Sequence, residues 1–184
     1  MRAPALVLAL AVLGLAAAEE GEDWAAVLNQ GWNQQVEIKV ENCLRRGTVA
    51  GATACLQALA EARPAEALPV LGRTLVDQNV PEAAFETVRA LQAYGTSAAE
   101  QLPALRAATR NSHGKVRAEA VKVLADLQDT GAVAQWIGLL RDPDGRVTQA
   151  ARESLKTVTG HDFGDDVGRH LARHVGDEIA FPFG

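Results

Sequence analysis

A stretch of about thirty residues recurs along this chain, and its recurrence limits the fold more than any other feature of the sequence. Residues 110–131 (RNSHGKVRAEAVKVLADLQDTG) align with residues 141–160 (RDPDGRVTQAARESLKTVTG) at a constant offset of 31. Two earlier segments, 77–95 and 48–64, share the spacing of small and apolar residues, which advance by four, four and three positions. That spacing places these residues on one face of a helix.

A second kind of segment lies between these predicted helices. Residues 64–78, 97–112 and 131–143 each have the pattern of a helix, and Pro69 and Pro103 fall in a first turn, where a missing amide hydrogen costs little. The chain is therefore predicted to be a series of helical hairpins that repeat every 31 to 36 residues. One such hairpin cannot bury its apolar face alone, so neighbouring hairpins must stack.

The turn before the last predicted helix has two interpretations. Asp142 and Asp144 could begin a calcium-binding loop, but residues 146–148 are Arg, Val and Thr where further oxygen ligands are required. The alternative is a turn that starts a helix. We therefore predict that Asn111 and Asp142 are N-cap residues, and that Pro143 is the first residue of its helix.

The N-terminal eighteen residues (MRAPALVLALAVLGLAAA) have the three-part pattern of a secretory signal. They contain one cation, Arg2, then an apolar run and three small residues, and an acidic segment follows. An uncleaved anchor or a buried helix is the alternative. We expect residues 1–18 to be a signal peptide, and the mature chain to be periplasmic or extracellular and to have no transmembrane segment, because no other run approaches about 20 apolar residues.

Composition and charge narrow the class of protein further. Alanine, the best helix former, accounts for 35 of the 184 residues. Residues 19–62 carry three basic and seven acidic side chains, residues 63–156 twelve and eleven, and residues 157–184 two and five. Since no segment is strongly cationic, nucleic-acid binding is not expected.

The two cysteines, Cys43 and Cys55, have two interpretations as well. In an oxidising compartment an even pair is typical of a disulfide, which is our prediction. Alternatively, both are small buried apolar residues. A zinc site is not expected, because the four histidines lie far along the chain.

Two motifs carry a family resemblance: NSHGKVRAEAVKVL at 111–124, and DPDGRV followed by AARESL within 142–155. They resemble bacterial HEAT-like repeats, the type also found in phycobilisome-lyase-related proteins. The resemblance covers about 48–160 and implies an all-α fold, a short right-handed α-solenoid of about four HEAT-like helical hairpins, which binds another protein. Residues 19–47 and 161–184 would then be capping segments at the two ends.

The same resemblance raises the question of a charge ladder. In the family, an Asp in the turn and an Arg or Lys six residues later form a ladder along the array. In this chain the pair is split, since Arg117 follows Asn111, whereas Asp142 is followed by Thr148. A regular ladder is therefore not expected, although stacking is.

The candidate partner-binding residues are Arg106, Arg110, Gln135 and Arg141, which the resemblance places on or beside a concave face. Arginines there could form bidentate contacts with an acidic peptide or protein. The alternative interpretation is solvated surface charge that pairs weakly with nearby acids.

Function is the least constrained property. No catalytic motif is found and no cofactor is expected, so we predict an exported, non-catalytic scaffold or adaptor for another protein of the cell envelope. The alternative is a metal-binding or hydrolytic protein that uses His170 and His174, which share one face if their segment is helical. A third possibility is a stabilising subunit whose exposed ends stack on a larger assembly.

Overall fold

The computed structural model describes residues 21–77 and 80–160, and it divides the chain between Gln101 and Leu102 into two compact units. All regular elements of the described residues are helices, and no strand occurs among them. In chain order the α-helices are α2 (Trp24–Asn29), α3 (Gln34–Arg46), α4 (Val49–Ala62), α5 (Leu68–Asp77), α6 (Pro81–Ala93), α7 (Leu102–Ala108), α8 (Gly114–Asp126), α9 (Val133–Leu139) and α10 (Gly145–Thr159). Short 3₁₀ helices precede three of them: η1 (Ala65–Ala67), η2 (Gly95–Gln101) and η3 (Thr130–Ala132).

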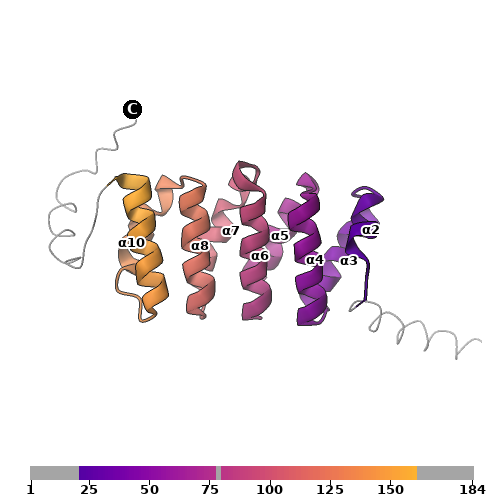
Figure 1. Ribbon diagram of the computed structural model, residues 1–184, viewed down its shortest axis with the longest axis horizontal. Helices are drawn as coiled ribbons and strands as arrows, with labels where there is room; N and C mark the ends of the chain where they lie inside the picture. The colour runs from indigo at the N-terminus through magenta and orange to yellow at the C-terminus, as the bar shows by residue number, and fades with distance from the viewer. Residues whose placement is uncertain (1–20, 78–79, 161–184) are drawn as a thin grey trace, which may run out of the picture. The chain divides into compact units, whose positions relative to one another are not determined.

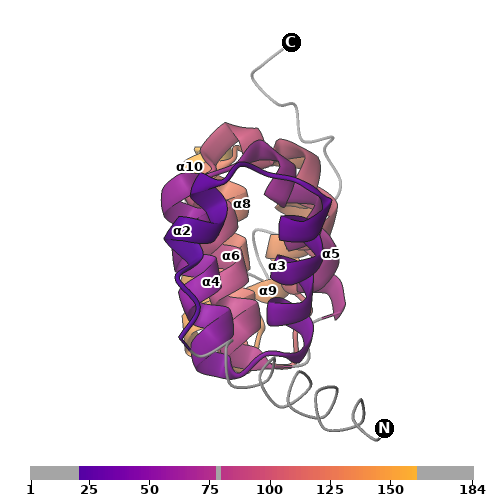
Figure 2. The same cartoon turned by 90° about the vertical axis from the view of Figure 1, so that its right-hand side faces the viewer.

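The first unit is built around α4. This helix packs against α2, α3 and α6, and α5 packs against α3 and α6. Figure 2 shows α2, α4 and α6 on one side of this unit and α3 and α5 on the other. Its core includes Leu56, Leu59, Val88 and Leu91, each at most 1% exposed. Burial of side chains of this size contributes roughly 1.5–3 kcal/mol each, so apolar packing between hairpins holds this unit together.

The second unit repeats the arrangement with four α-helices. Helix α8 packs against α7 and α10, and α9 packs against α10. Figure 1 shows α8 and α10 side by side. Leu124 from α8, Trp136 from α9 and Leu155 from α10 have no exposed surface. Leu124 and Leu155 recur at an offset of 31, so stacking buries equivalent apolar positions of the two repeats.

The all-α prediction is confirmed, and the helical hairpins of the described residues are those of a short α-solenoid. Every segment predicted to be helical between 48 and 160 contains a helix, and Pro69 and Pro103 are second residues of α5 and α7. Residues 19–47, predicted to cap the array, include α3, which packs against both α4 and α5. This segment therefore supplies a helix that pairs with α4.

The predicted N-caps are wrong. Asp144 is the N-cap of α10, and its side chain accepts a hydrogen bond from the backbone N of Arg146 at 3.0 Å. Asp142 lies two residues earlier and accepts from the backbone N of Asp144 at 2.8 Å. Asn111 accepts in the same way from the N of His113, the N-cap of α8, at 2.9 Å. Both side chains accept hydrogen bonds from backbone N–H groups of the turn before the helix. Pro143 lies in this turn and is therefore outside α10.

Three predictions fall on residues outside the described part of the chain: the signal peptide at 1–18, the C-terminal capping segment at 161–184, and the His170 and His174 pair within it. Among residues 21–77 and 80–160, no helix is long and apolar enough to cross a membrane.

Candidate functional site

The four candidate partner-binding residues lie on two helices of the second unit and on the turns that follow them. Arg106 is in α7 and Gln135 is in α9. Arg110 and Arg141 each lie two residues beyond the end of their helix, 31 residues apart. We call these four residues the α7–α9 surface.

Arg106 is bound within the protein. Its Nε and Nη2 donate to the two carboxylate oxygens of Asp129, at 2.7 and 2.5 Å. The side chain of Asp129 is only 4% exposed, whereas that of Arg106 is 39% exposed. The hydrogen bond to Asp129 raises the pKa of Arg106 above its usual value. The charge of Arg106 therefore serves first to neutralise a buried carboxylate.

Gln135 belongs to the same network. Its Nε2 donates to the carbonyl oxygen of Arg106 at 3.1 Å and also to Oγ1 of Thr109. Thr109 is fully buried and donates to that same carbonyl at 2.9 Å. The structure thus brings Arg106 and Gln135 together, but as part of a polar junction between successive hairpins.

Sequence reasoning missed Asp129 and Thr109. The repeat alignment gave no signal for the Arg106–Asp129 pair, because Ile137 stands where Arg106 would recur. The two residues are 23 positions apart, so only the stacking of the hairpins brings them together.

Arg110 and Arg141 differ from the other two candidates. Both residues are exposed, and their backbone N–H groups donate to carbonyls three residues back, at 3.0 and 3.3 Å. They therefore occupy the same position in the turns that follow α7 and α9. Segments 102–110 and 131–141 contain no acidic residue. The structure places these two arginines where a partner can reach them.

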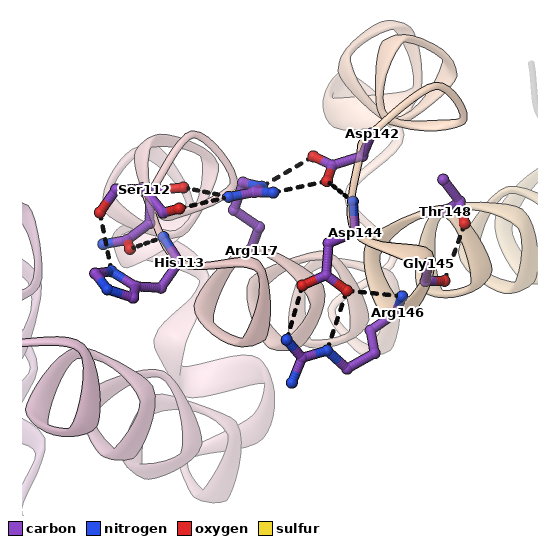
Figure 3. Close-up of polar contacts among 9 residues, drawn as sticks. Ser112, His113, Arg117, Asp142, Asp144, Gly145, Arg146 and Thr148 are labelled. Atoms are coloured by element: carbon purple, nitrogen blue, oxygen red, sulfur yellow. Dashed lines mark hydrogen bonds and ion pairs between the residues drawn. The ribbon is translucent and has the colours of Figure 1, made fainter.

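A second Arg–Asp pair joins the hairpins through the turns. Nε and Nη2 of Arg117 donate to the carboxylate of Asp142 at 2.9 and 2.6 Å, as Figure 3 shows. Nη1 of Arg117 donates to the carbonyl oxygens of Asn111 and Ser112 at 2.8 and 3.0 Å. The side chains of Arg117 and Asp142 are 13% and 7% exposed. The two residues that the sequence splits between repeats thus form one link of a ladder.

Two carboxylates of this turn have lowered pKa values. The hydrogen bonds from Arg117 hold the pKa of Asp142 below its usual range. Asp144 in the same turn accepts hydrogen bonds from the side chain and backbone of Arg146, which lower its pKa to about 2. Both carboxylates are therefore charged at neutral pH, and each forms an ion pair with an arginine of the same chain. In residues 21–77 and 80–160, no group of three or more His, Cys, Asp and Glu is placed to hold a metal ion.

Comparison with known proteins points to the same class of repeat. Residues 102–179 match the family described as HEAT repeats. Neither curated proteins nor solved structures give a match to this chain. The matched segment begins where the second unit begins, at Leu102. The match therefore shows that residues 102–179 are similar to HEAT repeats, and the helical hairpins within 102–160 agree with it.

Proposed function

We propose that this protein is a non-catalytic scaffold or adaptor that binds an acidic segment of another protein through the α7–α9 surface. Proteins of HEAT repeats are generally interaction scaffolds, which supports the protein partner. The observation that carries the proposal is the pair Arg110 and Arg141: two exposed arginines at equivalent turns, in two segments without an acid. Arg106 belongs to the same surface and forms an ion pair with the buried carboxylate of Asp129.

The charge of residues 102–160, the described part of the second unit, favours an acidic partner. Residues 102–160 carry nine basic and six acidic side chains, whereas residues 21–101 carry six and ten. Two of the six acids, Asp129 and Asp142, are buried beneath arginines. Each of these two pairs is neutral, so seven basic and four acidic side chains remain in residues 102–160. Guanidinium groups pair with carboxylates in bidentate geometry, and complementary charge also speeds encounter.

The repeat geometry suggests the spacing of acids in the partner. Arg110 and Arg141 hold the same position in successive repeats, and packed helices lie roughly 8–10 Å apart. An extended segment in the polyproline II conformation advances about 3.1 Å per residue with three residues per turn, so side chains three residues apart lie on the same side. Acids about three residues apart on an extended segment would therefore meet both arginines.

We also propose that the protein is exported and that its partner lies in the cell envelope. The support is the sequence of residues 1–18, whose single cation, apolar run and small residues are typical of a cleaved signal. Mass spectrometry of the protein from its native host tests this: loss of residues 1–18 is expected, and an intact N-terminus would contradict export by this route.

Peptide binding tests the proposed surface. We expect the chain from residue 19 onward to bind a labelled peptide with glutamates at every third position, as measured by fluorescence anisotropy. It should not bind the same peptide in which glutamines replace the glutamates. The double variant Arg110→Glu, Arg141→Glu should weaken binding at least about tenfold, because two attractive contacts become repulsive. Arg46→Glu, at the exposed end of α3, is the matched control and should leave affinity unchanged.

Two outcomes contradict the proposal. Equal loss of affinity in Arg46→Glu would indicate non-specific charge attraction rather than a binding surface. Tighter binding of a single-stranded oligonucleotide than of the acidic peptide, with the same dependence on Arg110 and Arg141, would assign the surface to nucleic acid.

A further inference from the structure

The first unit contains both cysteines of the chain, and it buries them together. Cys43 lies in the last turn of α3 and Cys55 in the middle of α4, and these two helices pack against each other. Neither residue has any exposed surface. Both are thiols in the structure, and the side chain of Cys43 hydrogen-bonds that of Cys55. The two sulfur atoms therefore face each other across the hairpin.

The surroundings of this pair control its reactivity. The hydrogen bond with Cys43 and burial both raise the pKa of Cys55 above its usual range. The thiolate is the reactive form of cysteine, so little of it exists here at neutral pH. We therefore expect the native pair to react slowly with external reagents, and to react faster before α3 has packed on α4.

We propose that Cys43 and Cys55 are a redox modification site, at which a disulfide oxidant joins α3 to α4 through an intramolecular disulfide. This inference concerns the first unit and does not depend on partner binding by the second. It requires no residue of the α7–α9 surface.

The reaction is ordinary thiol–disulfide exchange. One cysteine loses its proton and attacks one sulfur of the oxidant, so that a mixed disulfide forms and the other sulfur of the oxidant leaves as a thiolate. The second cysteine loses its proton and attacks the cysteine sulfur of that mixed disulfide, and this releases the other half of the oxidant. In total the two cysteines give up two protons and two electrons, and the oxidant disulfide becomes two thiols.

The bridge would restrain one particular junction. Cys43 is also the residue whose carbonyl accepts from the N of Gly47 at 3.0 Å, which fixes the end of α3. A bond from Cys43 to Cys55 would close a short loop around the turn between the two helices. Such a loop limits the unfolded chain and should raise stability without changing the packing.

Refolding in a redox buffer tests the proposal on the chain from residue 19 onward. After refolding in a mixture of reduced and oxidised glutathione, we expect a mass lower by two hydrogens, no alkylatable thiol and no glutathione adduct. The bridged protein should melt about 5 °C or more above the same protein kept in reductant. Folded, reduced protein should form the bridge more slowly than refolding protein.

Single variants make the result decisive. Cys43→Ala and Cys55→Ala should each melt at the same temperature in oxidant and in reductant, since neither can form the bridge. Two remaining thiols after oxidative refolding of the unaltered chain, stable glutathione adducts, or a covalent dimer would overturn the proposal. An oxidised form that melts below the reduced form would overturn it too, because the packed helices would then oppose the bond.

Discussion

The two units bury their apolar side chains in the same way but join their hairpins with different polar contacts. In the first unit, Arg73 of α5 approaches Glu37 and Glu41 of α3 at 3.1 and 3.9 Å, and the three side chains are 32–48% exposed. In the second unit, Arg106 and Arg117 form ion pairs with Asp129 and Asp142, whose side chains are only 4% and 7% exposed. The same fold thus tolerates a solvated junction and a buried ionic one.

This difference separates what holds the hairpins together from what aligns them. Apolar stacking is common to both units and supplies most of the free energy. A buried ion pair adds less net stability, because desolvation offsets attraction, but it penalises any shift that separates the partners. The HEAT-repeat match covers 102–179, the side of the chain with the buried pairs. We infer that those pairs fix the register between successive hairpins.

The largest effects should be the same in both units. Leu56 in α4 and Leu124 in α8 occupy equivalent repeat positions and are 1% and 0% exposed. Leu56→Ala and Leu124→Ala should each lower the free energy of unfolding by about 2–5 kcal/mol, through lost burial and a residual cavity. Urea denaturation measures this. A cost in one unit several times that in the other would show that the apolar cores are not alike.

The next largest effect should distinguish the units. Arg117→Ala leaves the carboxylate of Asp142 buried without its cation, and we expect it to cost about 2–4 kcal/mol of unfolding free energy. The matched change in the first unit, Arg73→Ala, removes an exposed pair and should cost about 0.5 kcal/mol. Similar losses for the two variants would mean that burial of the pair is irrelevant.

A double-mutant cycle sharpens this prediction. Asp142→Ala and the double variant Arg117→Ala, Asp142→Ala isolate the interaction between the two side chains. The double variant should be less destabilised than the sum of the single variants, because it leaves no unpaired buried charge. Strict additivity would argue against a buried ionic link.

The sequence predicts the apolar stacking of the hairpins better than the ionic contacts between them. The helices and their buried faces were predictable, because a spacing of small and apolar residues such as Ala120, Leu124 and Leu127 reports which side of a helix faces its neighbour. The ionic junctions were not. Arg106 has no repeating counterpart, and Arg117 and Asp142 are 25 residues apart, so stacked hairpins were needed to pair them.

The candidate site was predictable only in part. Arg110 and Arg141 were candidates because the family resemblance places them on or beside a concave face, and the structure exposes both. Gln135 and Arg106 were grouped with them, but their polar atoms turn to Thr109 and Asp129. A single sequence shows that a residue lies near a face but not which atoms its side chain meets.

Acid should reduce the difference in unfolding free energy between Arg117→Ala and the unaltered protein. Arg117 holds the pKa of Asp142 below its unfolded value, which is about 3.9. The stabilising contribution is thus complete above that value and is lost as the pH falls through the folded pKa. Urea denaturation between about pH 6 and pH 2 should therefore show the two proteins converging below about pH 4. A constant difference down to pH 2 would show that Asp142 does not titrate against Arg117.

The smallest effects should come from the helix starts, where the two repeats of the second unit differ. Asp144 caps α10 with its side chain, whereas His113, its counterpart at α8, makes no side-chain cap bond. Asp144→Ala should cost about 1 kcal/mol of unfolding free energy, and His113→Asp should add about 0.5 kcal/mol, because it supplies an acceptor for the first-turn amides. Thermal denaturation of both variants is the measurement. If His113→Asp destabilised the protein, the bond between His113 and Ser112 at 2.9 Å would be worth more than a cap, and the two turns would differ in more than their caps.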